Sequence, residues 1–297
     1  MKLFPLASSG LVLATTLIAA SFGCSSTAAA PDGSTPVVTD DASTDAGLDT
    51  APSTLPTIAE KEPNDGKTAA EIQNITVPAI VTGAIDPVSD VDGFRAKLTG
   101  GDLFVWKLEA TGADFTPYIG VVEKDDSVPH FVARGEMGKS IELEQFVTKS
   151  SDWQIAITDS RNATGRTPVG GATFGYKLTA QKVTRVPTPS AVGNTATSVL
   201  TSPSAVGLFD LSLSSATALD INVRAKRLST PSDIDSRLSI VNQADGTWVS
   251  TNDDMSSGQT DSKLGADALP AGKYVLVVEN VNPTAKTFGF EVVVTKR

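Results

Sequence analysis

The sequence predicts an all-β protein: two tandem antiparallel β-sandwich modules of jelly-roll-like form, placed after a signal peptide and a disordered linker. Three observations support this prediction. The chain of 297 residues contains 24 Gly and 17 Pro, which favour turns over long helices. Apolar and polar residues alternate in short runs between the turns, as in strands with one buried face. The runs also recur in the same order in two parts of the chain, which indicates a duplication.

The first element is a targeting segment over residues 1–23. Lys2 supplies a positive charge, and Leu11–Ala20 is an apolar run of 10 residues. As a helix this run spans only ~15 Å, about half of the hydrocarbon core of a bilayer. It therefore indicates a signal peptide rather than a membrane span.

The only cysteine of the chain follows in the sequence Gly23-Cys24-Ser25. This arrangement resembles the lipobox of bacterial lipoproteins, and the resemblance implies cleavage before Cys24 and acylation of its thiol. Serine rather than an acidic residue at positions 25 and 26 implies retention in the outer membrane. The alternative is ordinary cleavage near Ser21, which leaves a free thiol on a secreted protein.

The second element is a linker over residues 24–58. It consists almost entirely of Ser, Thr, Ala, Pro, Gly and Asp and contains no Lys or Arg. Such a segment cannot bury enough apolar surface to offset its chain entropy, so we expect disorder. We expect it to act as a tether with a reach of ~30–35 Å that holds the folded modules away from a membrane.

A proline-rich joint at Val186–Ser190 divides the rest of the chain into a first module (59–186) and a second module (187–297). Four predicted strands of the first module match four of the second in order and spacing. The pairs are Leu103–Ala110 with Ala218–Ala225, Thr116–Val122 with Ser236–Asn242, Asp152–Asp159 with Lys273–Asn280, and Phe174–Ala180 with Phe288–Val294. The order is kept while the loops vary, which is typical of duplicated modules.

Alternation within these strands predicts one buried face for each sheet. The predicted core faces are Phe104, Trp106 and Leu108; Leu219, Ile221 and Val223; Trp153, Ile155 and Ile157; and Tyr274, Leu276 and Val278. We therefore expect the first two tryptophans in the core. Ala244–Gly246 predicts a hairpin turn, and Trp248 just after it is expected to be exposed.

Several motifs of the first module share a pattern with a known family. They are Glu60–Asp65 (Glu-Lys-Glu-Pro-Asn-Asp), Val81–Ile85 and Ser89–Phe94. This pattern resembles the bacterial pre-peptidase C-terminal domain and the related collagen-binding domain of clostridial collagenases. The second module is similar to the remainder of the family pattern, through Asp235–Leu238, Ala244–Gly246, Asn252–Asp254 and Leu269–Tyr274. The resemblance covers most of residues 58–297 and implies a β-sandwich that accompanies other domains.

The two modules depart from the family pattern in different ways. The second has no Glu-Pro-Asn-Asp, and the first has no Asn-Asp-Asp. A duplicated ion site is therefore not expected. Ile157 and Thr158 stand where the family's collagen-binding strand carries aromatic residues, so collagen binding is not expected either. The protease domain that these modules usually flank is absent from this sequence.

The acidic residues of the first module predict a calcium site. In an extended chain Glu60, Glu62 and Asn64 share a face, as do Asp90 and Asp92. Together they offer five of the six to eight oxygen ligands that Ca²⁺ takes. Asp65 completes the predicted set, although its alternative role is to cap the turn at 66–72. The alternative for the whole set is a solvated acidic linker.

A loop of the second module is a further candidate. Trp248, Asn252, Asp253 and Asp254 could form an ion or ligand loop. Asp125 and Asp126 form a similar acidic pair in the first module. For both loops the alternative is a solvated turn.

Charge and residue counts exclude several classes of function. The balance of 24 Lys+Arg against 34 Asp+Glu gives a formal charge of -10, which opposes nucleic-acid binding. One Cys and one His (His130) cannot form an internal disulfide or a structural zinc site. No Gly-x-Ser-x-Gly motif accompanies the histidine, so we expect no hydrolase and no enzyme.

These observations predict a lipid-anchored protein of the bacterial cell envelope. We expect a non-catalytic binding or adhesion protein whose first sandwich is stabilised by calcium. Its expected partners are the membrane, through the anchor, and an extracellular polymer or protein. The alternative is a structural accessory that spaces envelope components and has no ligand of its own.

Overall fold

A computed structural model describes residues 55–65, 71–124, 131–165, 167–282 and 284–297 of the chain. The predicted signal peptide, Cys24 and most of the predicted linker lie outside these residues. So do Asp125, Asp126 and His130. The regular secondary structure of the described residues consists of strands and one helix of four residues, which confirms the predicted fold class.

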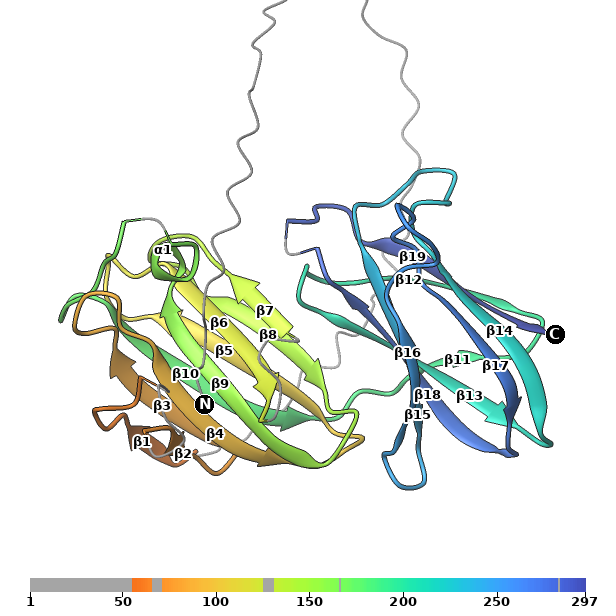
Figure 1. Cartoon of the computed structure of the whole chain (residues 1–297), viewed down its shortest axis with the longest axis horizontal. Coiled ribbons are helices and arrows are strands. Elements are labelled where there is room, and N and C mark those ends of the chain that lie inside the picture. Colours follow the sequence, from red (N-terminus) through yellow and green to blue (C-terminus); the bar gives the residue numbers. More distant parts are fainter. Residues whose placement is uncertain (1–54, 66–70, 125–130, 166, 283) are drawn as a thin grey trace, which may run out of the picture. The chain divides into compact units, whose positions relative to one another are not determined.

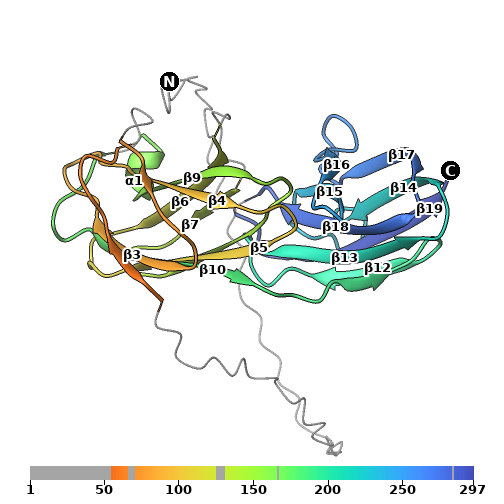
Figure 2. The same cartoon turned by 90° about the horizontal axis from the view of Figure 1, so that it is seen from below.

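The first sandwich consists of two five-stranded sheets, in the orders β1-β3-β10-β5-β8 and β2-β4-β9-β6-β7 (Figure 1). Its elements are β1 (Thr57–Ala59), β2 (Gln73–Asn74), β3 (Ala79–Ala84), β4 (Asp92–Leu98), β5 (Leu103–Ala110), β6 (Pro117–Glu123), β7 (Phe131–Arg134), β8 (Ile141–Phe146), β9 (Ser151–Asp159), α1 (Ser160–Ala163) and β10 (Gly175–Val183). Figure 2 shows the two layers, with β4, β9, β6 and β7 above β3, β10 and β5.

The second sandwich has a five-stranded sheet, β11-β13-β18-β15-β16, and a four-stranded sheet, β12-β19-β14-β17. Its strands are β11 (Thr188–Ser190), β12 (Thr195–Val199), β13 (Val206–Leu213), β14 (Thr217–Arg224), β15 (Ser236–Asn242), β16 (Trp248–Asn252), β17 (Lys263–Leu269), β18 (Gly272–Asn280) and β19 (Gly289–Lys296).

Both sandwiches have the same topology. Without the short parallel strands β1, β2 and β11, each keeps two sheets of four antiparallel strands. In chain order, the first, eighth, third and sixth strands form one sheet, and the second, seventh, fourth and fifth form the other. This is the order of a jelly roll. The sequence repeat covers four strands, whereas the structural repeat extends to all the antiparallel strands.

The predicted strands occur where the alternation places them. Leu103–Ala110 and Ser236–Asn242 are strands with the predicted bounds, and the other six differ only at their ends. The predicted hairpin joins β15 to β16. Gly246 lies in that turn with φ +68°, a conformation that glycine adopts without the steric cost of a side chain.

The four predicted core faces lie in two hydrophobic clusters, one inside each sandwich. Trp106 and Trp153 are buried in the first, as predicted, and Trp248 is 51% exposed. One expectation is wrong in detail. The sequence predicts one buried face per strand, but Val275 and Val277 on the opposite face of β18 are also buried. They belong to a third cluster, formed by residues of both sandwiches.

Candidate cation site

The acidic side chains of the first sandwich converge where β1, β3, β4 and β10 come together. Glu60 directly follows β1 and extends its pairing with β3, because its N–H donates to the Thr82 carbonyl at 3.0 Å. Its side chain turns back over β3 and accepts a hydrogen bond from the Ala84 N–H at 2.9 Å. A Cβ atom on Gly83 would lie 1.9 Å from Glu60 Oε2, so a side chain at this position of β3 would displace the Glu60 carboxylate.

Asp92 is the first residue of β4 and the most buried carboxylate of the site. Its side chain is fully buried, and its Oδ2 atom has no hydrogen-bond partner. One oxygen from each of Glu60, Glu62 and Asp92 lies within 4.8 Å of the other two. Among the described residues, no other group of three or more His, Cys, Asp or Glu side chains is brought this close.

Asn64 and Tyr176 complete the inner wall of the site. Asn64 is fully buried, and one end of its side-chain amide lies 3.2 Å from Glu62 Oε1 and 2.9 Å from Asp92 Oδ1. With its nitrogen at that end, the amide donates a hydrogen bond to each carboxylate. The buried Tyr176 hydroxyl donates to Glu60 Oε2 at 2.8 Å.

Asp90 and Asp65 lie at the edge of this group. The Asp90 carboxylate is buried and accepts hydrogen bonds from the N–H groups of Asp86 at 3.0 Å and of Val91 at 2.8 Å. Burial raises the pKa of both Glu62 and Asp90, and the negative charge of Asp65 adds a smaller contribution to each. The structure therefore brings Glu60, Glu62, Asn64 and Asp92 together, while Asp90 and Asp65 add negative charge beside them. The turn that Asp65 could cap begins outside the described residues.

The pKa values show how strongly the site disfavours its own negative charge. Burial, and then the charges of Glu60 and Asp90, raise the pKa of Asp92 to about 10. Burial, and then the charge of Glu62, raise the pKa of Asp90 to about 6. Burial and the neighbouring carboxylates also raise the pKa of Glu62. At neutral pH the cluster therefore needs a positive charge, which either protons or a bound cation can supply.

Among the described residues, no basic side chain supplies this charge. Within the part of the chain that the structure describes, none of the ion pairs involves Glu60, Glu62, Asp90 or Asp92. Buried carboxylates are normally paired or bound to a metal, so the arrangement fits a cation. The Asp92 Oδ2 atom, which is buried without a hydrogen-bond partner, is the atom that such a cation would satisfy most directly.

Sequence reasoning did not identify two residues that shape the site, Gly83 and Tyr176. A signal for Tyr176 was present in the repeat, where Phe-Gly-Tyr of the first copy corresponds to Phe-Gly-Phe of the second. The equivalent residue, Phe290, is buried in the second core and has no hydroxyl. The hydroxyl therefore occurs only in the copy that carries the acidic cluster.

The candidate loop of the second module has a different arrangement. Asn252 Oδ1 accepts a long hydrogen bond of 3.4 Å from the Lys263 N–H, and Asp253 Oδ1 accepts one of 3.0 Å from the Asp254 N–H. Burial, then the charges of Asp254 and Asp253, raise the pKa of Asp235, whose Oδ1 is buried without a partner. These carboxylates do not meet as closely as those of the first sandwich.

Comparisons with known proteins add similarities of fold. No protein-family model matches the sequence, and no curated protein matches it. One similar solved structure is the pre-peptidase C-terminal domain of collagenase from Bacillus anthracis, at 15% identity over 38% of this chain and 99% of that chain, with a TM-score of 0.30. Another is the M60 catalytic domain with the CBM51-1 and CBM51-2 domains of Clostridium perfringens ZmpB, at 8% identity over 69% of this chain and 33% of that chain, with a TM-score of 0.23.

A third similar structure contains the CUB1-EGF-CUB2 domains of human MASP-1/3, at 10% identity over 75% of this chain and 98% of that chain, with a TM-score of 0.21. The chain spans about a third of the length of the ZmpB structure, and nearly all of the other two. Because these TM-scores are all low, the similarities identify neither a family nor a ligand.

Proposed function

We propose that the protein is a non-catalytic binding or adhesion protein, tethered to the bacterial cell envelope through Cys24, whose first sandwich is stabilised by Ca²⁺. The fully buried Asp92 carboxylate carries the cation part of this proposal, because its Oδ2 atom lacks a partner beside two further carboxylates. The lipid part rests on the sequence around Cys24.

The donor atoms favour calcium over other metals. Glu60, Glu62 and Asp92 would bind the ion through carboxylate oxygens, and Asn64 through its amide oxygen after a rotation of the amide. Ca²⁺ accepts such oxygen sets in flexible geometry, whereas Mg²⁺ requires near-ideal octahedral geometry and gives up its water reluctantly. Zinc prefers nitrogen and sulfur ligands, which this cluster does not contain. When bound, the ion would supply the positive charge that the buried carboxylates lack.

We expect Ca²⁺ to raise the melting temperature of the full chain. Extracellular modules bind Ca²⁺ with dissociation constants of ~0.1–1 mM. At ~2 mM Ca²⁺, mass action then adds roughly 0.6–1.8 kcal/mol to the free energy of unfolding. For a chain of this size the midpoint rises by about 2–7 °C. The measurement is a thermal melt at pH 7 with Ca²⁺ and with a chelator.

The matched control for this melt is Asp253→Asn, which removes a carboxylate from the acidic loop of the second sandwich. This variant should keep the full response to Ca²⁺. A wild-type midpoint that is the same with Ca²⁺ and with chelator contradicts the cation site.

Exposed apolar side chains support a binding role. Trp248 is 51% exposed and Val249 is 42% exposed, and both lie on β16 at the edge of its sheet. Exposed aromatic residues of this kind contribute much of the energy of protein interfaces. We therefore assign the ligand contact to this edge, with an extracellular polymer or protein as ligand.

We expect Cys24→Ser to release the protein from membranes. Two or more acyl chains give stable anchoring, whereas a single chain gives only marginal binding. Among the described residues, no helix has the length and apolar character needed to cross a membrane. The measurement is phase separation of bacterial lysates in detergent, where the wild type should enter the detergent phase and the variant the aqueous phase. Recovery of both proteins in the aqueous phase would disprove the anchor.

A further inference from the structure

The two sandwiches share an apolar contact surface. It is the third hydrophobic cluster, and Val275 and Val277 contribute to it from the face of β18 that points away from the second core. The other members are Leu103 and Phe146 from the first sandwich and Val206, Leu208 and Val241 from the second. All of them are at most 7% exposed. A surface of this kind is removed from water only while the two sandwiches are in contact.

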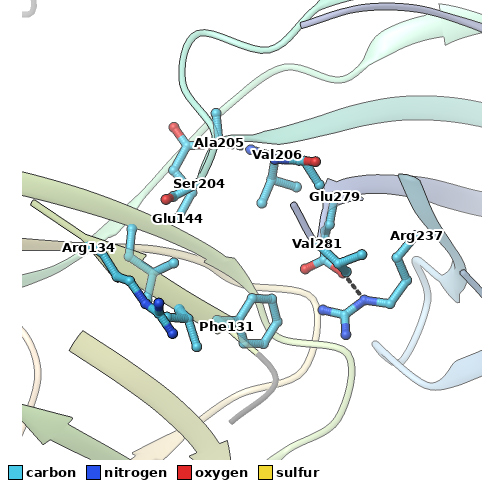
Figure 3. Close-up of a pocket in the computed structure, with 12 residues that line it drawn as sticks. Phe131, Arg134, Glu144, Ser204, Ala205, Val206, Arg237, Glu279 and Val281 are labelled. Atoms are coloured by element: carbon cyan, nitrogen blue, oxygen red, sulfur yellow. Dashed lines mark hydrogen bonds and ion pairs between the residues drawn. The ribbon is translucent and has the colours of Figure 1, made fainter. Parts of the chain in front are cut away.

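A buried carboxylate lies beside this cluster. Glu144 of β8 is 8% exposed and accepts a hydrogen bond of 2.7 Å from the Val206 N–H of β13. Its own N–H donates to the Ser204 carbonyl at 3.0 Å. Figure 3 shows Glu144 next to Ser204, Ala205 and Val206. Glu144 of the first sandwich is thus hydrogen-bonded to Ser204 and Val206, at the start of β13 in the second sandwich.

The segment between β10 and β11 (residues 184–187) contributes the counter-charge. Both terminal nitrogens of Arg185 donate to Glu144, the Nη1 atom at 2.8 Å from Oε2. The same nitrogen donates to the Val206 carbonyl at 2.7 Å. The hydrogen bond to Glu144 raises the pKa of Arg185, so the guanidinium is charged at every relevant pH. Glu144 of the first sandwich therefore accepts hydrogen bonds both from Arg185 of the connecting segment and from Val206 of the second sandwich.

Two further contacts extend this surface. The Arg237 guanidinium lies 5.3 Å from the centre of the Phe131 ring, at one wall of a cleft of about 320 Å³ (Figure 3). It is held there by a hydrogen bond of 2.8 Å from its Nε to Glu279. The Gly246 hairpin lies against the turn at Gly100, where a Cβ atom on Gly246 would come within 2.5 Å of the Gly100 carbonyl oxygen.

We propose that the two sandwiches unfold as one cooperative unit and that Glu144 is the residue that couples them. When either sandwich unfolds, the other loses the apolar contacts that it makes in the third cluster. Removal of the Glu144 carboxylate leaves the Arg185 charge and the Val206 N–H without their partner, which costs more than the loss of an exposed ion pair.

The test is differential scanning calorimetry of the full chain, with Glu144→Ala and the matched control Glu142→Ala. Glu142 is exposed on the same strand. We expect a single transition for the wild type, with equal calorimetric and van't Hoff enthalpies. We expect Glu144→Ala to lower its midpoint by roughly 5–15 °C, and Glu142→Ala by less than about 2 °C.

A second variant covers the case in which Glu144→Ala does not fold. Leu208→Ala removes apolar contacts from the same surface without disturbing a charge, and we expect a lower midpoint that still belongs to a single transition. Two separate transitions in the wild type would overturn cooperative unfolding. A Glu144→Ala midpoint as high as that of Glu142→Ala would overturn the role of Glu144.

Discussion

Trp106→Ala should lower the free energy of unfolding by about 3–5 kcal/mol, the range measured when a large buried side chain is truncated. Trp106 is fully buried in the first core, with its ring 6.1 Å from that of Phe104. Its indole N–H also donates to Gln145 Oε1 at 2.9 Å, and Gln145 is itself fully buried. The substitution therefore creates a cavity and removes a buried hydrogen bond. For a chain of this size, the melting temperature should fall by roughly 6–20 °C.

Trp248→Ala is the matched control, because it removes the same side chain from an exposed position. Trp248 is 51% exposed, so its loss should change the free energy of unfolding by no more than about 0.5 kcal/mol. Both variants are compared by urea unfolding, with the slope of the transition checked against the wild type. Equal losses for the two tryptophans would contradict the assignment of one to the core and the other to the surface.

The contrast between the tryptophans shows what alternation predicts well. Trp106 and Trp153 lie in strands with a period of two, and this period places them with neighbours that are also buried. Trp248 follows a turn, where the period is interrupted. The repeat strengthened each strand assignment, because two copies rarely carry the same accidental pattern.

The parts of the fold that could not be predicted depend on contacts that leave no period. β1, β2 and β11 have at most three residues each, too few for an alternating pattern. β18 carries the run Tyr-Val-Leu-Val-Val, which indicates burial on both faces as readily as burial on one. The second buried face becomes visible only when the contact between the sandwiches is known.

The candidate cation site was predicted only in part, because some of its contacts also leave no pattern in the sequence. The spacing of Glu60, Glu62 and Asn64 predicts a shared face, and in the structure all three approach Asp92. The spacing also places Asp90 on one face with Asp92, but it does not predict that backbone N–H groups hold the Asp90 carboxylate at the edge of the cluster. Nor does it predict the hydroxyl of Tyr176, which reaches Glu60 from β10, more than a hundred residues away in the chain.

Asp92→Asn should stabilise the cation-free protein at neutral pH and remove its response to Ca²⁺. In the cation-free fold the pKa of Asp92 is raised to about 10, while in the unfolded chain it is about 3.9. The proton on Asp92 therefore contributes stability that is complete below pH ~4 and declines as the pH rises towards about 10. Between pH 4 and pH 7 the decline amounts to something on the order of 4 kcal/mol.

Asparagine has the shape of the protonated aspartic acid but does not titrate. The variant should therefore keep at pH 7 the stability that the wild type has only in acid, a gain on the order of 2–4 kcal/mol in chelator. Asp90, whose pKa is about 6, still titrates and leaves a smaller decline between pH ~4 and ~6. The measurement is urea unfolding in chelator from pH 4 to pH 8, followed by a calcium titration at pH 7.

Asp261→Asn, a substitution in the second sandwich, should change the stability at pH 7 in the opposite direction. Burial opposes ionisation of Asp261, but its bonds to Arg227 and to the N–H groups of Lys226 and Ala225 outweigh burial and lower its pKa. This carboxylate stabilises the fold above pH ~4, and its loss should destabilise the protein at pH 7 by about 3 kcal/mol. The two buried aspartates thus differ because Asp261 has a cationic partner, Arg227, whereas the described residues offer no such partner to Asp92. An Asp92→Asn protein less stable than the wild type in chelator at pH 7 would contradict this difference.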